Sequence, residues 1–414
     1  MKNETIRRSM RSGIDVRVLR GGSHTEYFLT ATVEERPAEG SPESVRAVFS
    51  DLAGILLEEG IQPVRETVYG RRGAREEILG VRKSAYLDQG MDPTPPGAYL
   101  DGAPPCGAEF GGAQIWGIAP KANDKAAVST VDCPGGLRGR LWTGSGFRFL
   151  HVPAVRGTDA DGRLPAGCAT QAERMFENAR EAVESHGFKY TNVVRTWIYV
   201  RRLLDWYDDL NKVRNALYQR PGYFGRNGSP RFPASTGIQG RLLDEECVMD
   251  VLALDCNGSG GIEASPILTT AKQGQAFSYR SAFARGMALR AGKRRTIHVS
   301  GTASINGAGE TIHKTDAEAQ SLQTLMSVAA VLEQQGAGLE NICSSTVFCK
   351  DVEAYEAFRR AARLLRVPRF PAVFVLADVC RHDLLVEVEA VAVVGGGAAA
   401  ARTADGPAAE EVRK

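Results

Sequence analysis

Residues 369–394 read RFPAVFVLADVCRHDLLVEVEAVAVV, and they belong to the part of the chain whose pattern of helices and strands is clearest. It contains two apolar runs, Val373–Ala377 and Leu385–Val394, separated by a short polar segment. Apolar, β-branched runs of this length are typical of buried strands. Because side chains alternate along a strand, Glu387 and Glu389 share one face of the second run. We therefore expect two strands that close a sheet, the last of which carries two acids on one face.

The sequence before these strands predicts the rest of one α+β unit. Apolar residues recur at helical spacing after Asp316, which can cap a helix, and Gly336 ends that helix. The expected order is β-β-α-β-α-β-β. Its earlier elements are a strand at Thr296–Gly301, a hairpin turn at Asn306–Gly309, a helix from Asp316 to about Gln335, a strand at Ser345–Cys349 and a helix at Val352–Leu365.

The middle of the chain repeats this order, and the beginning repeats it less clearly. The middle elements are a helix at Gln171–Ser185, a strand at Thr196–Val200, a helix at about Leu204–Tyr218, a strand after Pro233–Gly237 and a strand at Cys247–Leu254. The first elements are a helix at Ser44–Glu59, a strand at Glu66–Gly70, a second-helix region at Arg75–Leu87 without clean periodicity, an irregular Pro/Gly loop at Pro93–Pro105 and a strand at Ala113–Ile118.

A repeat of this length indicates duplicated domains, since the units of solenoid proteins are much shorter. We expect a degenerate N-terminal domain at 1–130, a middle domain at 131–257, a C-terminal domain at 258–396 and a disordered tail at 397–414. Asn257–Gly261 reads as a flexible joint.

The composition excludes several classes of function. The net charge is only +2 over 414 residues, which gives no general attraction to nucleic acid or to an acidic membrane. No run is long enough to span a membrane, and the charged start of the chain does not resemble a secretion signal. Eight cysteines without a C-x-x-C pair fit buried thiols in a cytoplasmic protein. Six histidines without ligand spacing predict no metal site, and no motif predicts a cofactor.

Several motifs, in the same order in two of the copies, resemble the RidA/YjgF superfamily. They are Ser300–Ala303, Thr346–Phe348, Arg369–Ala372 and Val386–Ala392, and in the middle copy Arg195–Val200 and Phe232–Ile238. The resemblance implies three tandem chorismate-mutase-like domains that form a pseudo-trimer within one chain, with ligand clefts between neighbours. We expect a monomer or a small homo-oligomer.

Within that superfamily, the imine deaminases use an arginine directly after a Pro-Ala pair to hold a carboxylate. They also use a glutamate of the last strand to position water. Glu387 matches the glutamate, whereas Val373 and Ser235 stand at the arginine position of two copies. The middle copy has Val248 at the place of the glutamate. Simple imine hydrolysis is therefore not the expected activity.

Chorismatases share the absence of that arginine. The run Arg381–Glu389, the motif Arg195–Val200, and Tyr207 followed by Arg214 are similar to chorismatase sequences. Three features depart from that pattern: Asp208 stands where a cation is expected, the loop Tyr218–Arg231 is longer, and the N-terminal copy looks more complete.

The candidate residues follow from these motifs. Glu387 is the expected catalytic residue, because a partly desolvated glutamate can donate a proton or hold a water. The expected substrate-binding residues are Arg195, Tyr207, Arg214, Ser235, Thr236 and Gly237. Further candidates are Ala372, Glu389, Tyr199 and Ser300. Each group of candidates also has a purely structural explanation. Glu387 and Glu389 could be solvated acids of an edge strand, and Tyr207 and Arg214 could lie on a surface helix with ordinary ion pairs. The segment Ser235–Gly237 could be the bulged start of a strand.

The sequence thus favours a chorismatase-like hydrolase or lyase of secondary metabolism that acts on a small anionic substrate. Its site would lie between the middle and C-terminal copies. An imine or enamine hydrolase and a non-catalytic ligand-binding protein are the alternatives.

Overall fold

Three consecutive blocks of the chain each fold into a six-stranded sheet with two helices. The computed structural model describes residues 7–32, 42–94, 97–121, 126–220, 222–225, 228–240, 243–256 and 261–395. The expected tail at 397–414 and residues 257–260 of the expected joint lie outside these ranges.

The C-terminal unit contains the two helices and the two closing strands that its sequence predicts. Asp316 and Asp351 begin its two helices: their side chains accept hydrogen bonds from the backbone N–H of Ala319 and Ala354. Its elements are β13 (Ile262–Ile267), η5 (Ala276–Tyr279), β14 (Gly286–Ala291), β15 (Arg294–Ala303), α5 (Ala317–Glu333), η6 (Leu339–Asn341), β16 (Ile342–Cys349), α6 (Val352–Leu364), β17 (Val373–Leu376) and β18 (Val386–Val394).

The middle unit has the same sequence of helices and strands. Its elements are β7 (Ala127–Cys133), η3 (Pro134–Gly136), β8 (Leu137–Gly144), β9 (Phe147–Arg156), α3 (Cys168–Glu184), η4 (Tyr190–Asn192), β10 (Val193–Val200), α4 (Leu203–Tyr218), β11 (Ala234–Gln239) and β12 (Cys247–Cys256). The expected boundary after residue 130 falls inside β7. We propose to place it before Ala127, because β7 pairs within the middle sheet.

The N-terminal unit is more complete than its sequence suggests. The region without clean periodicity forms a regular helix, and four residues of the expected irregular loop form a parallel strand beside β4. Its elements are β1 (Arg7–Arg11), β2 (Ile14–Arg20), β3 (His24–Thr32), α1 (Pro42–Glu58), β4 (Gln62–Gly70), η2 (Arg72–Ala74), α2 (Arg75–Asp88), β5 (Ala98–Asp101) and β6 (Phe110–Pro120).

The expected order of elements was wrong at the start of each unit. Three strands precede the first helix, so the order is β-β-β-α-β-α-β-β. The turn at Asn306–Gly309 does not join two ladder strands; it closes only an isolated bridge between Ile305 and Thr311. The Asn and Gly residues correctly predicted a tight turn, but the segments on its two sides pair at one position and do not form two strands.

All three sheets have one topology. The strand order in the C-terminal sheet is β13-β14-β15-β18-β16-β17, and the other two sheets follow the same order. In each sheet the pair formed across the second helix, such as β16 and β17, is parallel, and the other pairs are antiparallel. The last strand lies between two neighbours, so β18 is a central strand, and the edge-strand alternative for Glu387 and Glu389 is wrong.

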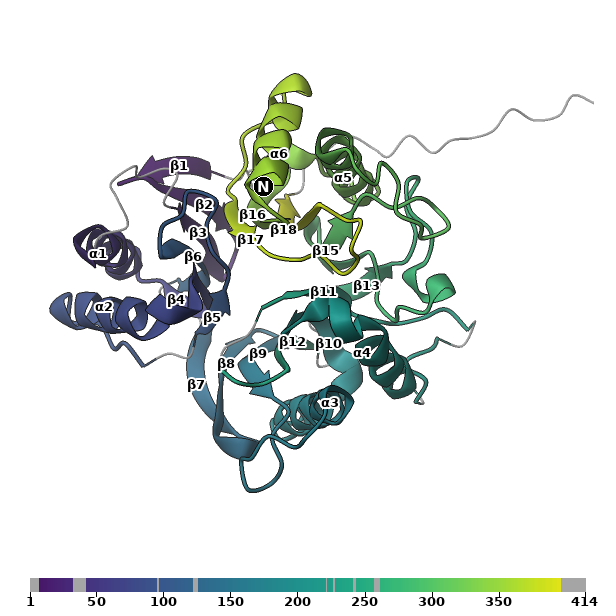
Figure 1. Cartoon of the computed structure of the whole chain (residues 1–414). Coiled ribbons are helices and arrows are strands. Elements are labelled where there is room, and N and C mark those ends of the chain that lie inside the picture. Colours follow the sequence, from purple (N-terminus) through teal and green to yellow (C-terminus); the bar gives the residue numbers. More distant parts are fainter. Residues whose placement is uncertain are drawn as a thin grey trace, which may run out of the picture.

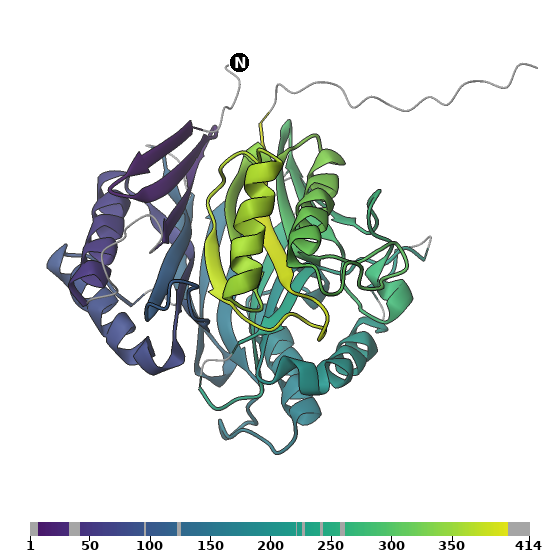
Figure 2. The same cartoon turned by 45° about the horizontal axis from the view of Figure 1, so that its top comes forward.

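Each sheet packs its helices on one face and the other two sheets on its opposite face (Figure 1). Helices α1–α6 of the described chain lie at the outside of the molecule, and its three sheets surround a common centre. Figure 2 shows α5 and α6 side by side over the C-terminal sheet. Apolar residues from all three units, among them Tyr69, Trp197 and Phe348, form one central core. The chain is therefore a pseudo-trimer of α+β units, because each inner sheet face is covered by its neighbours.

Polar contacts between the units fix this arrangement. The Tyr69 hydroxyl lies 3.1 Å from that of Thr346, which joins the N- and C-terminal units. Arg140 Nε donates to the Pro63 carbonyl, which joins the middle and N-terminal units.

That the chain stays a monomer or a small oligomer remains a proposal. Within the described ranges, no helix is both long and apolar enough to cross a membrane.

The close approach of the N- and C-terminal units gives a first prediction. A Cβ atom added to Gly102 would lie 2.1 Å from Cγ1 of Val375, and Leu376 N–H donates to the Ala103 carbonyl at 2.7 Å beside it. Gly102→Ala should lower the free energy of unfolding by about 1–3 kcal/mol through overpacking. Gly54→Ala is the control: Gly54 lies in α1 with open space around it. Equal denaturant midpoints for the two variants would contradict this packing.

Candidate active site

A cavity of about 50 Å³ lies between the middle and C-terminal units. One wall comes from α4 and β11, which contribute Tyr207, Arg214, Ser235 and Gly237. The facing wall comes from β15, β18 and the loops beside them, and it includes Glu387. The cavity therefore brings together residues that are far apart in sequence.

Glu387 reaches the cavity because side chains alternate between the two faces of β18: Val386 and Val388 point into the core of the C-terminal unit, and Glu387 points to the opposite face. Its strand partners are Ala303 on β15 and Phe348 on β16, and only 4% of the residue is exposed. Gly301 makes room for the carboxyl group, since a Cβ atom there would lie 2.1 Å from Glu387 Oε1. The glycine in this strand is thus explained by the close approach of the acid.

The surroundings of Glu387 keep its carboxyl group protonated at neutral pH. Burial and, to a smaller extent, the neighbouring Glu389 raise its pKa from 4.5 to about 8, although Arg195 acts in the opposite direction. A neutral acid in a closed cavity is a proton donor. Below about pH 8 the carboxyl group is mostly protonated and therefore cannot act as a base.

Glu389 faces the same side but does not line the cavity. Its Oε2 atom accepts from Arg195 Nη2 at 2.7 Å and from the Thr236 hydroxyl at 2.5 Å. Arg195 Nη2 also donates to Thr236 Oγ1 at 2.6 Å, and Gly301 N–H donates to the same oxygen at 3.1 Å. This buried network joins β10 and β11 of the middle unit to the C-terminal sheet.

Three arginines lie around the cavity: Arg214, Arg285 and Arg381. Arg285 donates twice to the Gly274 carbonyl, at 2.9 and 2.8 Å. Arg381 donates to the Gly309 carbonyl at 2.6 Å. Within the described ranges none of the three forms an ion pair with a carboxylate. Their positive charge is therefore available to an anion.

Arg214 has an additional unsatisfied donor. The residue is 2% exposed, its guanidinium lies 5.4 Å from the Phe283 ring centroid, and it bonds Asn211 through Nη2. Its Nε atom has no hydrogen-bond partner among the described residues. A buried donor without a partner is costly, so a ligand or a water in the cavity would satisfy it.

Tyr207 and the serines complete the middle unit's wall. The Tyr207 ring packs over Gly237, where a Cβ atom would lie 3.3 Å from the ring. Burial raises the pKa of the Tyr207 hydroxyl, so it remains a neutral donor. Ser235 accepts from the Thr196 hydroxyl at 2.9 Å, and its backbone N–H donates to Ser300 Oγ at 2.9 Å.

The structure divides the sequence-based candidates into three groups. Five line the cavity: Glu387, Tyr207, Arg214, Ser235 and Gly237. Four lie directly behind them as buried hydrogen-bonding partners: Arg195, Thr236, Glu389 and Ser300. Two lie elsewhere: Tyr199 belongs to the central core, and Ala372 lines a different cavity. Arg195, an expected substrate-binding residue, does not line the cavity, because Glu389 and Thr236 hold its guanidinium behind the wall.

Sequence reasoning missed Arg285 and Arg381 as site residues. Arg381 opens the run that resembles chorismatases, so its position was visible, but the sequence did not show where it points. Arg285 precedes β14 in a segment without a recognisable motif. Its backbone is held beside β15 by hydrogen bonds: Ser300 N–H donates to the Arg285 carbonyl, and Arg285 N–H donates to the Ile267 carbonyl.

The three units differ at the position of Glu387. Strand register places Val248 opposite Tyr199 in the middle unit and Gly112 opposite Tyr69 in the N-terminal unit, as Glu387 stands opposite Phe348. Val248 is therefore at the matching place, as expected. Among these three positions only Glu387 can transfer a proton. In the described part of the chain, no three His, Cys, Asp or Glu side chains group as metal ligands would.

Comparisons with known proteins agree with this architecture. The profile of the family Endoribonuclease L-PSP matches residues 275–394. A 3-hydroxybenzoate synthase of Streptomyces hygroscopicus is 28% identical over 263 residues, which cover 56% of this chain and 72% of that protein. A RutC family protein of Pasteurella multocida (strain Pm70) is 30% identical over 93 residues, which cover 22% of this chain and 67% of the relative.

A solved chorismatase structure has the same fold. It superimposes with a TM-score of 0.54 at 17% sequence identity, and the match covers 90% of this chain and all of the chorismatase chain. The repeated α+β unit, the family profile and the RutC relative lead to one conclusion: the chain belongs to the RidA/YjgF superfamily of endoribonuclease L-PSP-like proteins.

Proposed function

We propose that this protein is an enzyme that protonates and then cleaves or rearranges chorismate or a similar small enol ether with two carboxylates. One observation carries the proposal: a cavity lined by a protonated glutamate and three arginines without carboxylate partners in the described chain. The likeness in fold to a chorismatase and in sequence to a 3-hydroxybenzoate synthase supports the substrate class.

The charge of the cavity fits a dianion. Arg214, Arg285 and Arg381 carry three positive charges, and Glu387 adds no negative charge below pH 8. Arginine suits carboxylates because its planar guanidinium can donate two parallel hydrogen bonds. The free Nε of Arg214 and the hydroxyl of Tyr207 would supply further donors.

Glu387 would act as a general acid. Its proton moves to the methylene carbon of the enolpyruvyl group, and the ether oxygen stabilises the resulting oxocarbenium ion. Water adds to that ion and returns a proton to the Glu387 carboxylate. The hemiketal then breaks its bond to the ether oxygen carried by the ring. That oxygen takes up a proton as the hemiketal hydroxyl loses one, which gives pyruvate and an alcohol. In the rearranging variant of the reaction, a hydroxyl group of the substrate adds in place of water.

The size of the cavity bears on how the substrate is admitted. A volume of about 50 Å³ holds a few waters, whereas sites for small molecules usually enclose roughly 300–1,000 Å³. The described state is therefore closed. Arg381 and Tyr279 lie in non-strand segments of the wall, with the guanidinium 5.8 Å from the ring centroid. We propose that these side chains separate to admit the substrate.

The first test replaces the acid. Glu387→Gln should preserve the fold and ligand binding but lower turnover of chorismate by about 10²–10⁴-fold, the usual contribution of general acid–base catalysis. Mass spectrometry of chorismate incubated with the purified protein measures turnover, and calorimetry measures binding. Wild-type turnover by the variant would refute the acid role. Binding of chorismate without turnover by the wild type would favour a ligand-binding protein, and turnover of short imino acids alone would favour an imine hydrolase.

A second test needs no substrate. Glu387 has a folded-state pKa of about 8 against an ordinary value of 4.5, so the folded protein binds the proton more tightly than the unfolded chain does. Its contribution to stability is fully present below about pH 4.5 and is lost as the pH rises toward 8, at up to about 1.4 kcal/mol per pH unit. Glu387→Gln should therefore gain stability over the wild type between pH 5 and pH 8. A constant difference in unfolding free energy would show that the acid titrates normally.

A third test concerns Glu389 as a positioning residue. Its negative charge raises the pKa of Glu387, and it also neutralises Arg195. Glu389→Gln should lower the pKa of Glu387 and move the alkaline limb of the kcat/KM profile to lower pH. Glu389→Asp, which keeps the charge, is the control. The Gln variant should also lose about 3–5 kcal/mol of stability, because Arg195 remains buried without its partner. An unmoved alkaline limb in a folded Gln variant would contradict this role.

A further inference from the structure

One side of the candidate active site is covered by the segment 268–285, which connects β13 to β14 in the C-terminal unit and contains η5. Four of its side chains line the cavity: Tyr279, Ser281, Phe283 and Arg285. The corresponding connections of the other units are much shorter: residues 12–13 join β1 to β2, and residues 134–136 join β7 to β8. The C-terminal unit therefore has a covering segment that the described parts of the other two units lack between these strands.

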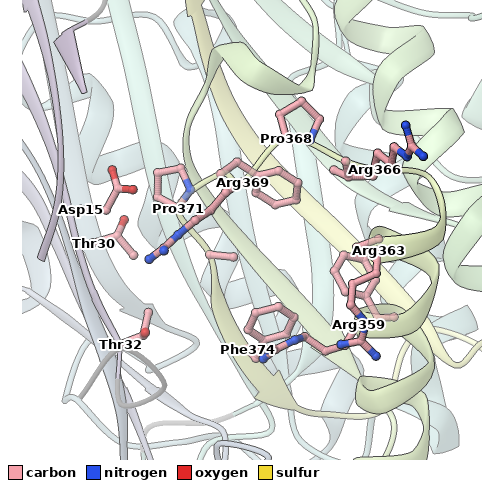
Figure 3. A pocket seen from close by; sticks show the side chains of 15 residues that line it. Asp15, Thr30, Thr32, Arg359, Arg363, Arg366, Pro368, Arg369, Pro371 and Phe374 are labelled. Atoms are coloured by element: carbon pink, nitrogen blue, oxygen red, sulfur yellow. The ribbon is translucent and has the colours of Figure 1, made fainter. Parts of the chain in front are cut away.

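The interface between the C-terminal and N-terminal units lacks such a segment and has an open cleft. Its volume is about 480 Å³, against about 50 Å³ for the candidate active site. Asp15 of β2 and Thr30 of β3 line one side of this cleft, and α6 lines the other (Figure 3). Because the strand order of the three sheets is the same, β2 and β3 correspond to β14 and β15, and α6 corresponds to α4. The two cavities thus have corresponding walls, and the segment 268–285 accounts for the smaller volume of the candidate active site.

Asn215 in α4 of the middle unit binds this segment across the interface. Its Nδ2 atom donates to the Arg280 carbonyl at 2.7 Å, and its Oδ1 atom accepts from the Ala282 N–H at 3.0 Å. A carboxamide carries donors and an acceptor, so one side chain satisfies the backbone groups on both sides of Ser281. The turn 279–282 is therefore held by a helix of the opposite wall of the cavity.

The turn that Asn215 holds is strained. Arg280 has a φ of 68°, a left-handed conformation that residues other than glycine rarely adopt. Such a conformation persists where the surrounding contacts fix it, and strained residues of this kind gather at functional sites. Loss of the Asn215 hydrogen bonds on either side of Ser281 would allow Arg280 to relax.

The ends of the turn are anchored independently of Asn215. Before the turn, Phe277 packs edge-to-face against Phe232 of the middle unit, with ring centroids 5.3 Å apart. After it, the Ala284 N–H donates to the Pro233 carbonyl at 2.9 Å. Loss of Asn215 would therefore free the residues between these two anchors and leave the rest of the segment in place.

We propose that Asn215 is a positioning residue that holds the turn 279–282 over the candidate active site, and that release of its two hydrogen bonds opens the cavity to the substrate. In the closed state, the turn keeps Tyr279 and Ser281 at the cavity. In the open state, the turn leaves α4, and the cavity widens toward the volume of the open cleft. The nature of the substrate rests on the proposed function, whereas the attachment of the turn to α4 does not.

Hydrogen–deuterium exchange of the full chain, measured by mass spectrometry, tests this attachment without a substrate. Asn215→Ala should speed amide exchange at residues 278–283 by about tenfold, because the two hydrogen bonds that close the turn are lost. Asn215→Asp keeps an acceptor for the Ala282 N–H and should give a smaller increase. Lys212→Ala is the control, because Lys212 lies on α4 and bonds Asp209 of the same helix. A cooperative thermal transition of each variant shows that it is folded.

Ligand kinetics separate the opening of the cavity from a purely structural role. The Glu387→Gln background should bind chorismate without turnover. In that background, Asn215→Ala should raise both the association and the dissociation rate constants of chorismate about tenfold, as measured by stopped-flow fluorescence. Association is faster because the open state is more populated, and dissociation is faster because the closed state is less stable. A general loss of structure would instead slow association.

Two results would overturn the proposal. The first is equal amide exchange at residues 278–283 in the Asn215→Ala variant and the wild type. The second is an association rate constant that is unchanged or lower in the Asn215→Ala variant. Failure of chorismate to bind the Glu387→Gln protein would refute the proposed function, and the exchange measurement would still decide the role of Asn215.

Discussion

The buried ion pair between Arg195 and Glu389 is the interaction on which the rest of the site depends. It crosses the interface of two units at 2.7 Å, and Thr236 bonds both partners, whereas Arg195 Nη1 has no hydrogen-bond partner among the described residues. Taking two charges out of water is unfavourable unless they meet in close contact, so this pair is tolerable only where β10, β11 and β18 come together in the observed register. Its negative end lies beside Glu387 and raises the pKa of that acid. One contact thus sets both the docking of the units and the protonation of the proposed catalyst.

The two glutamates of β18 are both buried but have different neighbours. Glu389 meets a cation and a hydroxyl and belongs to a closed network. Glu387, two residues earlier on the same face, has no such partner among the described residues and remains a neutral acid in the cavity. The arginines around that cavity lie on other elements and keep their charge for a ligand. This division lets one strand supply a structural anion and a proton donor side by side.

The sequence predicted the repeated unit well, because its signals are local. The cap at Asp316 and the alternation along Val386–Val394 require no knowledge of distant residues. Glu387, Tyr207 and Arg214 could be found from motifs and helical spacing. The additional leading strand of each unit and the strand at Ala98–Asp101 were missed, because edge strands carry weak patterns and depend on their neighbours. The positions of Arg285 and Arg381 and the partner of Arg195 depend on packing between units, which no local pattern encodes.

Joining three units in one chain has a consequence for how the protein can change. In a homotrimer of identical subunits, every substitution occurs three times, once at each interface. Here Glu387, Val248 and Gly112 occupy corresponding positions and are encoded separately. A mutation at one interface therefore leaves the other two untouched, so that the three interfaces can diverge under separate selection. Covalent linkage also fixes the ratio and the order of the three units, which a mixture of freely assembling paralogues could not guarantee.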